Sequence, residues 1–324
     1  MKNEIDLSIV TPTLGRFSEA WLKRLLAVKG SVQFILVYPP QVDFRTIDRT
    51  IDDPRLIAIK SPYKGEMMQR FVGLLNASGK YVLALDDDDF VHPEICQLST
   101  QYFDRFPDSW ILRLKKAVID ISNQERIQQP WASIPDVSQL EICKKTVENP
   151  YPYQNGNYKG LLEIPIAPLK TKFDSRYLIW PFVNRTDNAG YHFENFNNIV
   201  WNNKIVQQAL PSLSQATDII GAVKWIPSTG FDRLSGLFIQ SQLFKADAII
   251  GHWLPGSEQI RYVDKSPSLK PPRFHVISDF LLIKRFPQYG YLWNLFFSKL
   301  YGVPRTLGKL AKLRLGKAKS SLPT

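Results

Sequence analysis

The chain has 324 residues, of which 44% are hydrophobic and 22% charged, a composition typical of globular proteins. This composition excludes collagen-like, disulfide-rich and intrinsically disordered classes. The two cysteines, Cys96 and Cys143, have no CxxC spacing, so we expect reduced thiols in a reducing compartment. The four histidines are too scattered along the chain to indicate a zinc site.

The net charge of +11 is concentrated near the C-terminus. From Asp264 onward, twelve Lys and Arg residues are set against two acidic residues, so this segment carries +10 and the rest of the chain +1. The tail therefore suits an anionic surface, whereas the body has no excess of positive charge with which to bind a nucleic acid.

No stretch of the sequence predicts export or a membrane span. The opening run MKNEIDLSIV contains acidic residues, and its apolar part is too short for a signal peptide. A span needs roughly 20 apolar residues, and no stretch approaches that length. We therefore expect a cytoplasmic protein, with peripheral attachment to the inner face of the cell membrane through the tail.

The first hundred residues alternate between predicted strands and helices. Apolar, β-branched runs predict strands at 7–11, 32–38, 56–60 and 81–85, and helical periodicity covers 19–28 and 66–77. This order predicts an α/β fold with a mostly parallel sheet flanked by helices. Ligands of such sheets bind beyond the carboxyl ends of the strands.

The second half has weaker patterns. From about Asp120 to Trp201, frequent Pro, Asn, Tyr and Trp predict loops and short strands that shape an acceptor site. Helices are predicted over 203–210 and 233–246, with Asp247 inside a helix, and a strand over 248–251. We expect one domain over 1–255, with halves 1–115 and 116–255, and a basic, aromatic, helical tail over 256–324.

The strongest chemical signal is the run Asp86–Asp89, which follows the strand at 81–85 directly. Four adjacent carboxylates repel one another, which raises their pKa values or frays the strand unless a cation is bound. Mg²⁺ or Mn²⁺ would relieve this repulsion and bridge phosphate oxygens, as the departure of a diphosphate requires. A solvated turn before a helix that begins near Pro93 is the alternative.

These residues resemble the core of the family 2 glycosyltransferases of the GT-A fold. The run LSIVTPTLGR at 7–16 is similar to the family's first strand and its Pro-Thr nucleotide loop. Gly65, Arg70, Gly73 and Gly79 match the family's helix and turn, and Leu85 with Asp86–Asp89 stands where its Asp-x-Asp motif lies. The resemblance covers roughly residues 5–100. It implies metal-dependent, inverting transfer of a sugar from a nucleotide-diphosphate donor, of the UDP type, to a glycan or lipid-linked acceptor.

The resemblance also implies roles for single residues. Thr11, Pro12 and Thr13 would line the base pocket, and Arg70 would face the nucleotide or its diphosphate. Asp86 and Asp87 would bind the donor, with Asp86 near the ribose or base. Asp88 would be the main ligand of Mn²⁺ or Mg²⁺, supported by Asp86.

His252 is a further candidate from the sequence itself. It follows the predicted strand at 248–251 and could supply a late contact to the metal or the diphosphate. A histidine beside a tryptophan, here Trp253, is more often packed than ligating, so packing is the alternative.

Besides Phe71, which stands where the family's helix has asparagine after the arginine, the sequence departs from the family pattern in two places. The second strand ends at Tyr38-Pro39-Pro40, without the family's base-holding aspartate, and Tyr38 could stack on a base instead. The family's Glu-Asp pair is also missing. Asp232 is the first candidate for the base that deprotonates the acceptor hydroxyl, unless its role is structural. The other candidates are Asp218, Asp187 and Glu258.

Two other functions stay open on the sequence alone. A sugar nucleotidyltransferase is disfavoured because no Gly-rich phosphate loop follows the first strand. A non-catalytic protein that binds a glycan or a nucleotide sugar is consistent with the two departures. In the tail, Tyr289–Tyr301 predicts a helix whose apolar arc would lie on a membrane or dock on the domain. The arc comprises Leu292, Trp293, Leu295, Phe296 and Leu300.

Overall fold

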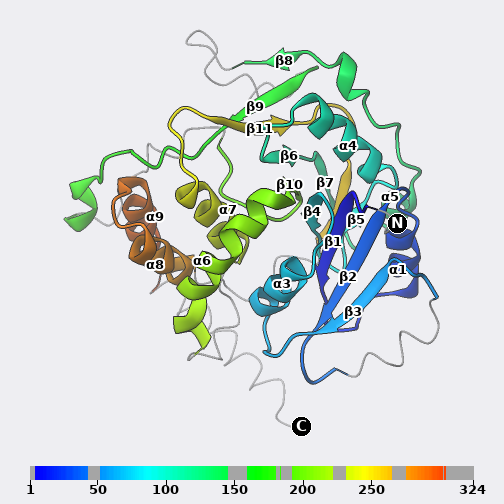
Figure 1. Cartoon of the computed structure of the whole chain (residues 1–324), viewed down its shortest axis with the longest axis horizontal. Helices are drawn as coiled ribbons and strands as arrows, with labels where there is room; N and C mark the ends of the chain where they lie inside the picture. The colour runs from blue at the N-terminus through cyan, green and yellow to red at the C-terminus, as the bar shows by residue number, and fades with distance from the viewer. Residues whose placement is uncertain are drawn as a thin grey trace, which may run out of the picture.

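The computed structural model describes residues 4–42, 52–144, 159–179, 183, 192–221, 231–264, 275–301 and 303. Its centre is a nine-stranded sheet in the order β3-β2-β1-β4-β10-β6-β11-β9-β8 (Figure 1). The strands of this sheet are β1 (Leu7–Pro12), β2 (Val32–Tyr38), β3 (Leu56–Lys60), β4 (Tyr81–Ala84), β6 (Ile111–Arg113), β8 (Ile142–Cys143), β9 (Leu161–Pro165), β10 (Ile199–Asn202) and β11 (Ile249–Trp253).

The directions of the strands bring several strand ends to one edge of the sheet. β3, β2, β1 and β4 are parallel, β10 is antiparallel to both β4 and β6, and β11 is parallel to β6. The carboxyl ends of β1, β4, β6 and β11 therefore lie at the same edge as the start of β10. The predicted fold class, a mostly parallel sheet flanked by helices, is confirmed.

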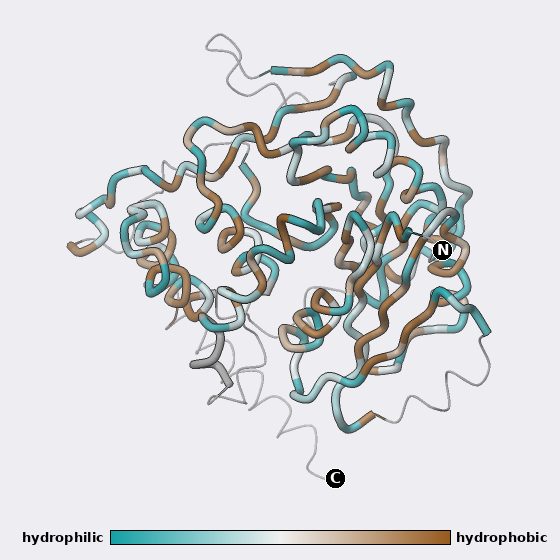
Figure 2. Tube along the Cα trace, viewed as in Figure 1, coloured by the Kyte–Doolittle hydropathy of each residue, from teal (hydrophilic) through white to brown (hydrophobic). Residues whose placement is uncertain are grey.

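Alternation along the strands produces a hydrophobic core on each face of the sheet. In β2, Phe34 and Leu36 face one core while Ile35 and Val37 face the other, and all four are buried. Figure 2 shows the resulting concentration of hydrophobic residues along β1 and β2. Because both faces are covered, these strands read as continuous apolar runs in the sequence.

The helices divide between the two faces. Residues of α1 and α4 enter one core, and residues of α3, α6, α7, α8 and α9 enter the other. The helices are α1 (Glu19–Leu26), α3 (Glu66–Leu75), α4 (Ile95–Arg105), α5 (Gln124–Gln128), α6 (Asn203–Gly221), α7 (Phe231–Gln242), α8 (His275–Arg285) and α9 (Gly290–Leu300), with short 3-10 turns η1 (Val137–Gln139) and η2 (Ser175–Leu178).

Helix α3 lies unusually close to β1. Gly65 precedes it with φ of 127°, a conformation that favours glycine, and a Cβ at Gly73 would meet Val10 Cγ1 at 2.2 Å. The missing side chain at Gly73 lets the helix settle on the strand. The same packing holds Arg70, one turn before Gly73 on the same side of α3, at the carboxyl end of β4, where it pairs with Asp86.

A second sheet in the order β5-β12-β7 lies beyond the acidic run, with β5 (Phe90–Val91), β7 (Lys116–Asp120) and β12 (Ile260–Asp264). β12 pairs with both other strands, and buried residues of α8 and α9 join the core of α6 and α7. In the described residues, the segments before and after the predicted boundary at residue 255 therefore pack into the same sheet and core. The basic stretch 305–319 lies outside them.

The apolar arc predicted for 289–301 corresponds to α9, but most of it faces the protein. Leu292 and Leu295 are fully buried, Trp293 and Phe296 are half-buried, and Leu300 is exposed. The docked alternative therefore describes this helix. No helix in the described part of the chain has the length and apolar character needed to cross a bilayer.

Candidate active site

The loop after β1 is held beside the acidic run. Thr13 is buried and donates its hydroxyl hydrogen to Asp87 Oδ2 at 2.7 Å, while the amide of Gly15 donates to Thr13 Oγ1 at 2.9 Å. Gln69 of α3 donates to the carbonyl of Thr13 at 2.9 Å. The predicted pair of motifs, Thr11–Thr13 and Asp86–Asp89, is thus joined directly.

Arg70 and Asp86 form the centre of the site. Arg70 is fully buried, donates from Nη2 to Asp86 Oδ1, and donates from Nε to Glu66 Oε1 at 3.1 Å. Burial lowers the pKa of the Arg70 guanidinium, but the charges of Asp86, Glu66 and Asp232 outweigh burial and leave that pKa above its ordinary value. The positively charged Arg70 side chain is therefore fixed at the carboxyl end of β4.

The last aspartate of the run has a different environment. Asp89 is buried, and its Oδ1 accepts the amide hydrogen of Val263 in β12 at 3.1 Å. Burial, together with the charges of Asp86 and Asp88, raises the pKa of the Asp89 carboxyl to about 8. Asp89 thus connects the run to the second sheet, while Asp86, Asp87 and Asp88 stay partly exposed.

Asp232 lies near this centre, as its predicted role requires. It stands in the first turn of α7, and its Oδ1 accepts the amides of Phe196 and Asn197 at 2.7 and 2.6 Å. Burial raises the pKa of the Asp232 carboxyl, while those two amides and the charge of Arg70 lower it in part and Asp86 raises it. The loop that Asp232 holds is itself tied to the end of β4, because Asn198 donates its amide to the carbonyl of Ala84 at 3.1 Å.

His252 lies elsewhere. Its ring packs against Phe106 at 4.4 Å, and its Nδ1 pairs with the Tyr102 hydroxyl at 2.8 Å, both on the α4 side of the sheet. Burial lowers the pKa of His252 to about 4, and none of the carboxylates at Asp86–Asp89 contributes to that shift. The predicted ligand set of Asp88, Asp86 and His252 is therefore not assembled; the packed alternative describes His252.

This burial gives His252 a measurable effect on stability. Its pKa is depressed from 6.5, so the unfolded chain binds the proton first, and stability is lost as pH falls from about 6.5 toward 4. We expect His252 to contribute a loss of about 3 kcal/mol in unfolding free energy across that window. Urea unfolding at several pH values should show a flatter acid limb for His252→Gln, and an identical limb in both proteins would contradict the assignment.

Several buried polar atoms around this edge lack a hydrogen-bond partner among the described residues: Thr11 Oγ1, Arg70 Nη1, Asn197 Oδ1 and Asn198 Oδ1. Asn198 also has φ of 60° and donates its amide to the carbonyl of Ala84, the last residue of β4. Because buried polar atoms are normally paired, such a concentration indicates a place for a polar ligand or ordered water.

The structure also describes three other residues that the sequence analysis considered. Tyr38 is fully buried in the core, so its ring is not presented for stacking on a base. Glu258 forms ion pairs with Arg126 at 3.2 Å and with Arg261 of β12 at 3.3 Å, beside the second sheet. Asp247 lies in a turn with φ of 58° after α7, not inside a helix. Asp187 and the side chain of Asp218 lie outside the described residues.

The structure adds residues that the sequence did not single out. Gln69 bridges α3 to the loop after β1, and Glu66 pairs with Arg70 at i and i+4, a spacing that could have indicated it. At the end of β6, the Arg113 guanidinium lies 3.3 Å from the Phe193 ring and 4.1 Å from the Trp253 ring. No local pattern predicts this second cluster, because its members come from three distant segments.

The carboxylates suit a divalent cation that is completed by a substrate. No group of three or more His, Cys, Asp or Glu in the described ranges is arranged to hold a metal. However, the charges of Asp86 and Asp88 both act on Asp89, so three carboxylates are close enough to repel one another. Mg²⁺ is commonly bound by one or two carboxylates together with substrate phosphates, which fits Asp86 and Asp88.

The fold and this edge define a mixed α/β protein with an acidic site at the carboxyl ends of parallel strands. No protein-family model matches the sequence, and no curated protein matches it. Among solved structures, the crystal structure of residues 1–349 of S. aureus TarS is similar with a TM-score of 0.49 and 11% identity, over 86% of this chain and 66% of that one.

The same TarS fragment in complex with UDP-GlcNAc gives a TM-score of 0.47 and 13% identity, over 86% of this chain and 67% of that chain. Its complex with UDP gives 0.47 and 12%, over 86% and 66%. The chain thus spans just under two thirds of the first of these TarS chains and 39% of a longer TarS chain.

Proposed function

We propose that this protein is a glycosyltransferase of the GT-A type, which moves a sugar from a nucleotide-diphosphate donor to a glycan or lipid-linked acceptor. The observation that carries the proposal is the convergence of Asp86–Asp88, Arg70 and Asp232 at the carboxyl ends of β1 and β4. These groups come from segments up to about 160 residues apart, and the fold brings them to one edge of the sheet.

On the donor side, the loop Thr11–Thr13 and the carboxylate of Asp86 would bind the nucleoside, of which a uridine is our expectation. Arg70 carries a fixed positive charge beside Asp86, and its Nη1 has no partner among the described atoms. That donor hydrogen suits a diphosphate oxygen. A Mg²⁺ or Mn²⁺ held by Asp88 and Asp86, when bound, would neutralise charge on the leaving diphosphate.

On the acceptor side, Asp232 would act as the base. Two backbone amides fix Oδ1, so Oδ2 is the oxygen that would take the proton of the acceptor hydroxyl. The acceptor oxygen then forms a bond to the anomeric carbon while the bond from that carbon to the diphosphate oxygen breaks. A single displacement of this kind inverts the anomeric configuration.

The proposal is tested by donor hydrolysis over a panel of nucleotide sugars with Mn²⁺ or Mg²⁺, comparing wild type with Asp88→Asn. We expect release of the nucleoside diphosphate from one donor, dependent on the metal and reduced by about 10²-fold or more in the variant. Asp108→Asn, an exposed aspartate in the loop between α4 and β6, is the matched control.

Other results would point to the other functions. Binding of a donor without release in any condition would indicate a non-catalytic nucleotide-sugar-binding protein. Formation of pyrophosphate from a nucleoside triphosphate and a sugar phosphate would indicate a nucleotidyltransferase. Activity that survives in both Asp88→Asn and a chelator would contradict the metal role of Asp88.

Location at the inner face of the cell membrane is part of the proposal. The charges at 305–319 lie outside the described residues, so the argument for tail attachment is the +10 charge from Asp264 onward. Pelleting with anionic vesicles of a protein that lacks 304–324 but keeps α8 and α9 tests this attachment, and unchanged pelleting would refute it.

A further inference from the structure

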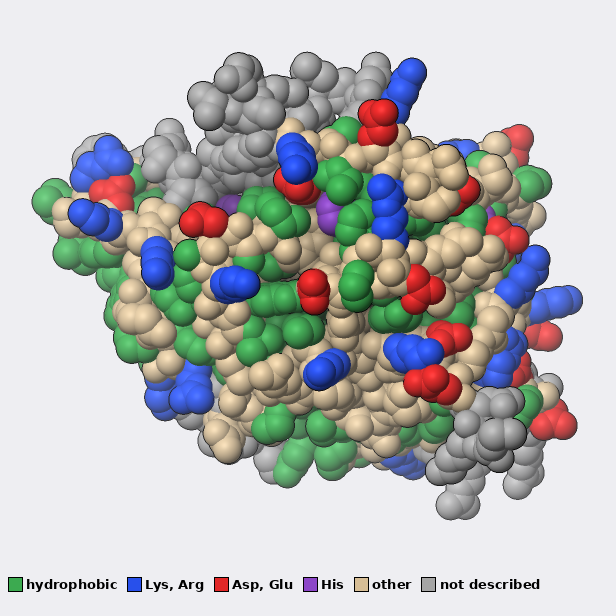
Figure 3. Space-filling view, turned by 45° about the horizontal axis from the view of Figure 1, so that its top comes forward, with side chains coloured by type: hydrophobic (Ala, Val, Ile, Leu, Met, Phe, Trp, Pro, Cys, Tyr) green, Lys and Arg blue, Asp and Glu red, His purple; other side chains and the backbone are tan. Residues whose placement is uncertain are grey.

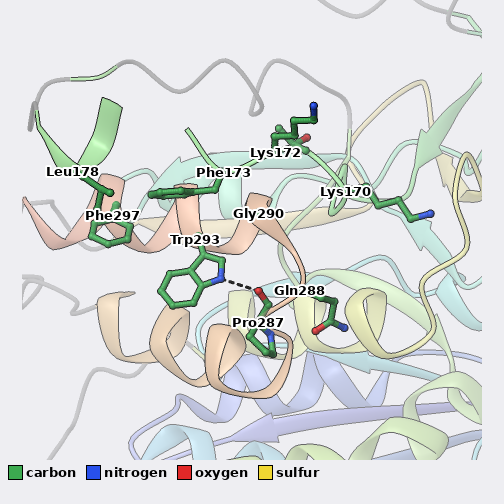
Figure 4. A pocket seen from close by; sticks show the side chains of 10 residues that line it. Lys170, Lys172, Phe173, Leu178, Pro287, Gln288, Gly290, Trp293 and Phe297 are labelled. Atoms are coloured by element: carbon green, nitrogen blue, oxygen red, sulfur yellow. Dashed lines mark hydrogen bonds between the residues drawn. The ribbon is translucent and has the colours of Figure 1, made fainter. Parts of the chain in front are cut away.

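An open trough lies on the surface formed by the segment 170–178 and α9. Its volume is about 580 Å³, and aromatic rings from both sides line it (Figure 4). Phe173 and Phe297 lie 5.5 Å apart, and Trp293 stacks toward Phe297 at 6.3 Å. Lys170 and Lys172 stand at its rim.

Specific backbone and side-chain contacts hold the walls of the trough in place. Gly290 lets the segment 171–173 approach the start of α9, because a Cβ there would meet the carbonyl of Thr171 at 2.3 Å. Asn294 is buried, accepts the amide of Asp174 at 2.8 Å and donates to the carbonyl of Lys172 at 3.1 Å. The indole of Trp293 donates to the carbonyl of Pro287 at 2.9 Å, which fixes its ring in the trough (Figure 4).

Beside the trough, two large apolar side chains point into solvent. Leu178 is 61% exposed and Ile179 is 85% exposed, the highest value among the large hydrophobic residues described. They stand at the end of η2, which lies beside α9 at the left of the molecule in Figure 1. Two adjacent exposed aliphatic side chains next to an aromatic trough indicate an interaction surface.

The charge around this surface is almost entirely positive. The elements that form it, 170–179 and 284–300, contain six basic residues and a single acidic one. Lys170, Lys172, Lys284, Arg285 and Lys299 are exposed, whereas the acid, Asp174, is paired with Arg176 at 2.7 Å. Figure 3 shows apolar and basic side chains gathered at the same end of the molecule.

We propose that this surface docks on an anionic phospholipid bilayer, with Leu178 and Ile179 inserted among the headgroups and the lysines on the lipid phosphates. Positive charge around exposed aliphatic and aromatic side chains is the chemistry that the membrane interface selects, with Trp at the boundary. A protein partner of the same shape would need matching acidic side chains, whereas an anionic bilayer presents that charge everywhere. The site is separate from the acidic edge and does not depend on the proposed transferase activity.

This surface differs from the helix face that the sequence indicates. Leu292 and Leu295 pack inside the protein, so α9 serves as the support of the trough and not as an amphipathic helix lying on lipid. The inserted residues belong instead to η2 and its end, and the basic tail that follows α9 in the sequence adds attraction to the same membrane.

The test is sedimentation of the full-length protein with vesicles of phosphatidylglycerol and phosphatidylcholine, against phosphatidylcholine alone. We expect binding only to the anionic vesicles. Leu178→Asp and Ile179→Asp should each weaken it about tenfold or more, because an inserted aliphatic side chain is replaced by a charge. Lys172→Glu should weaken it about fivefold or more.

Matched controls come from exposed positions elsewhere. Val118→Asp, 62% exposed on β7, and Lys204→Glu, exposed on α6, should bind the vesicles as wild type does. Circular dichroism melts of all variants check folding. Absence of vesicle binding by wild type, equal losses in test and control variants, or losses in Lys172→Glu with none in the two aspartate variants would each overturn the proposal.

A second measurement tests whether the trough itself lies against the membrane. Lipids brominated on the upper acyl chain should quench tryptophan fluorescence on binding, and Trp293→Phe should remove most of that quenching while vesicle binding is retained. Because Trp180 follows Ile179 directly in the sequence, both proteins carry Trp180→Phe in this measurement. Unchanged quenching on adding Trp293→Phe would then overturn the proposed orientation. Donor hydrolysis in the same variants should equal wild type, which keeps this test independent of the transferase.

Discussion

Asp86→Asn is expected to lower the free energy of unfolding by about 3 kcal/mol, a larger loss than its partner's replacement causes. The reason is an asymmetry in burial: Arg70 has no exposed surface, whereas the Asp86 side chain is 35% exposed. Removing the carboxylate leaves a fully buried guanidinium whose remaining ion-pair partner is Glu66, which is half exposed, with the charge of Asp232 as a weaker support. Removing the guanidinium with Arg70→Met leaves a carboxylate that water can reach, and about 1 kcal/mol is expected.

A double-mutant cycle measured by urea unfolding tests this asymmetry. Arg70→Met/Asp86→Asn should be more stable than Asp86→Asn alone, since the double variant contains no stranded buried charge. Asp104→Asn, on the exposed side of α4, is the control and should stay within about 0.5 kcal/mol of wild type. Equal losses in both single variants, or a double variant that is the least stable, would contradict the arrangement.

The strands and helices of the first hundred residues were predictable because local pattern and tertiary environment agree there. β2 and β3 have the predicted bounds, and α1 begins at the predicted Glu19 after Ser18, whose hydroxyl accepts the Trp21 amide at 3.1 Å. Parallel strands buried on both faces need continuous apolar runs, and such runs are visible without an alignment.

Later elements were harder because long-range packing decides them. α6 continues through Pro211 to Gly221, where the sequence pattern ends at Leu210, since burial of Leu213 on the far side of the proline holds the helix. α8 lies inside the predicted helical tail, but its buried residues contact α7, so it belongs to the core of the protein. β12 joins β7 and β5 in one sheet through pairings between segments about 144 and 169 residues apart.

The candidate site was predictable where its residues belong to recognisable motifs. Thr13, Arg70 and Asp86 lie together because two motifs end on neighbouring strands. Asp232 was the first candidate for the base on the sequence, but only the fold shows that its charge acts on Arg70. His252 was misplaced because alternation along β11 turns its side chain to the α4 face, away from the acidic edge; a single residue's shift in register decides such a question.

Asp232→Asn is expected to reduce kcat for sugar transfer by about 10²- to 10⁴-fold, the range for loss of a general base. The asparagine oxygen can still accept the amides of Phe196 and Asn197, so the fold should lose only about 1 kcal/mol. The KM for the donor should change little, because the proposed donor contacts lie at Thr11–Thr13, Arg70 and Asp86. Initial rates with the donor identified by the hydrolysis panel measure both parameters.

The pH profile separates a base from a structural carboxylate. A base works only when deprotonated, so wild-type kcat should fall as pH falls through the Asp232 pKa, which burial places above that of an ordinary carboxyl group. Asp232→Asn should lose this acid limb. Glu258→Gln, which alters the rival carboxylate held by Arg126 and Arg261, should keep both kcat and the limb. Full turnover in Asp232→Asn would show instead that Asp232 serves only to hold the loop at 196–197 against α7, and the base would have to come from a different carboxylate.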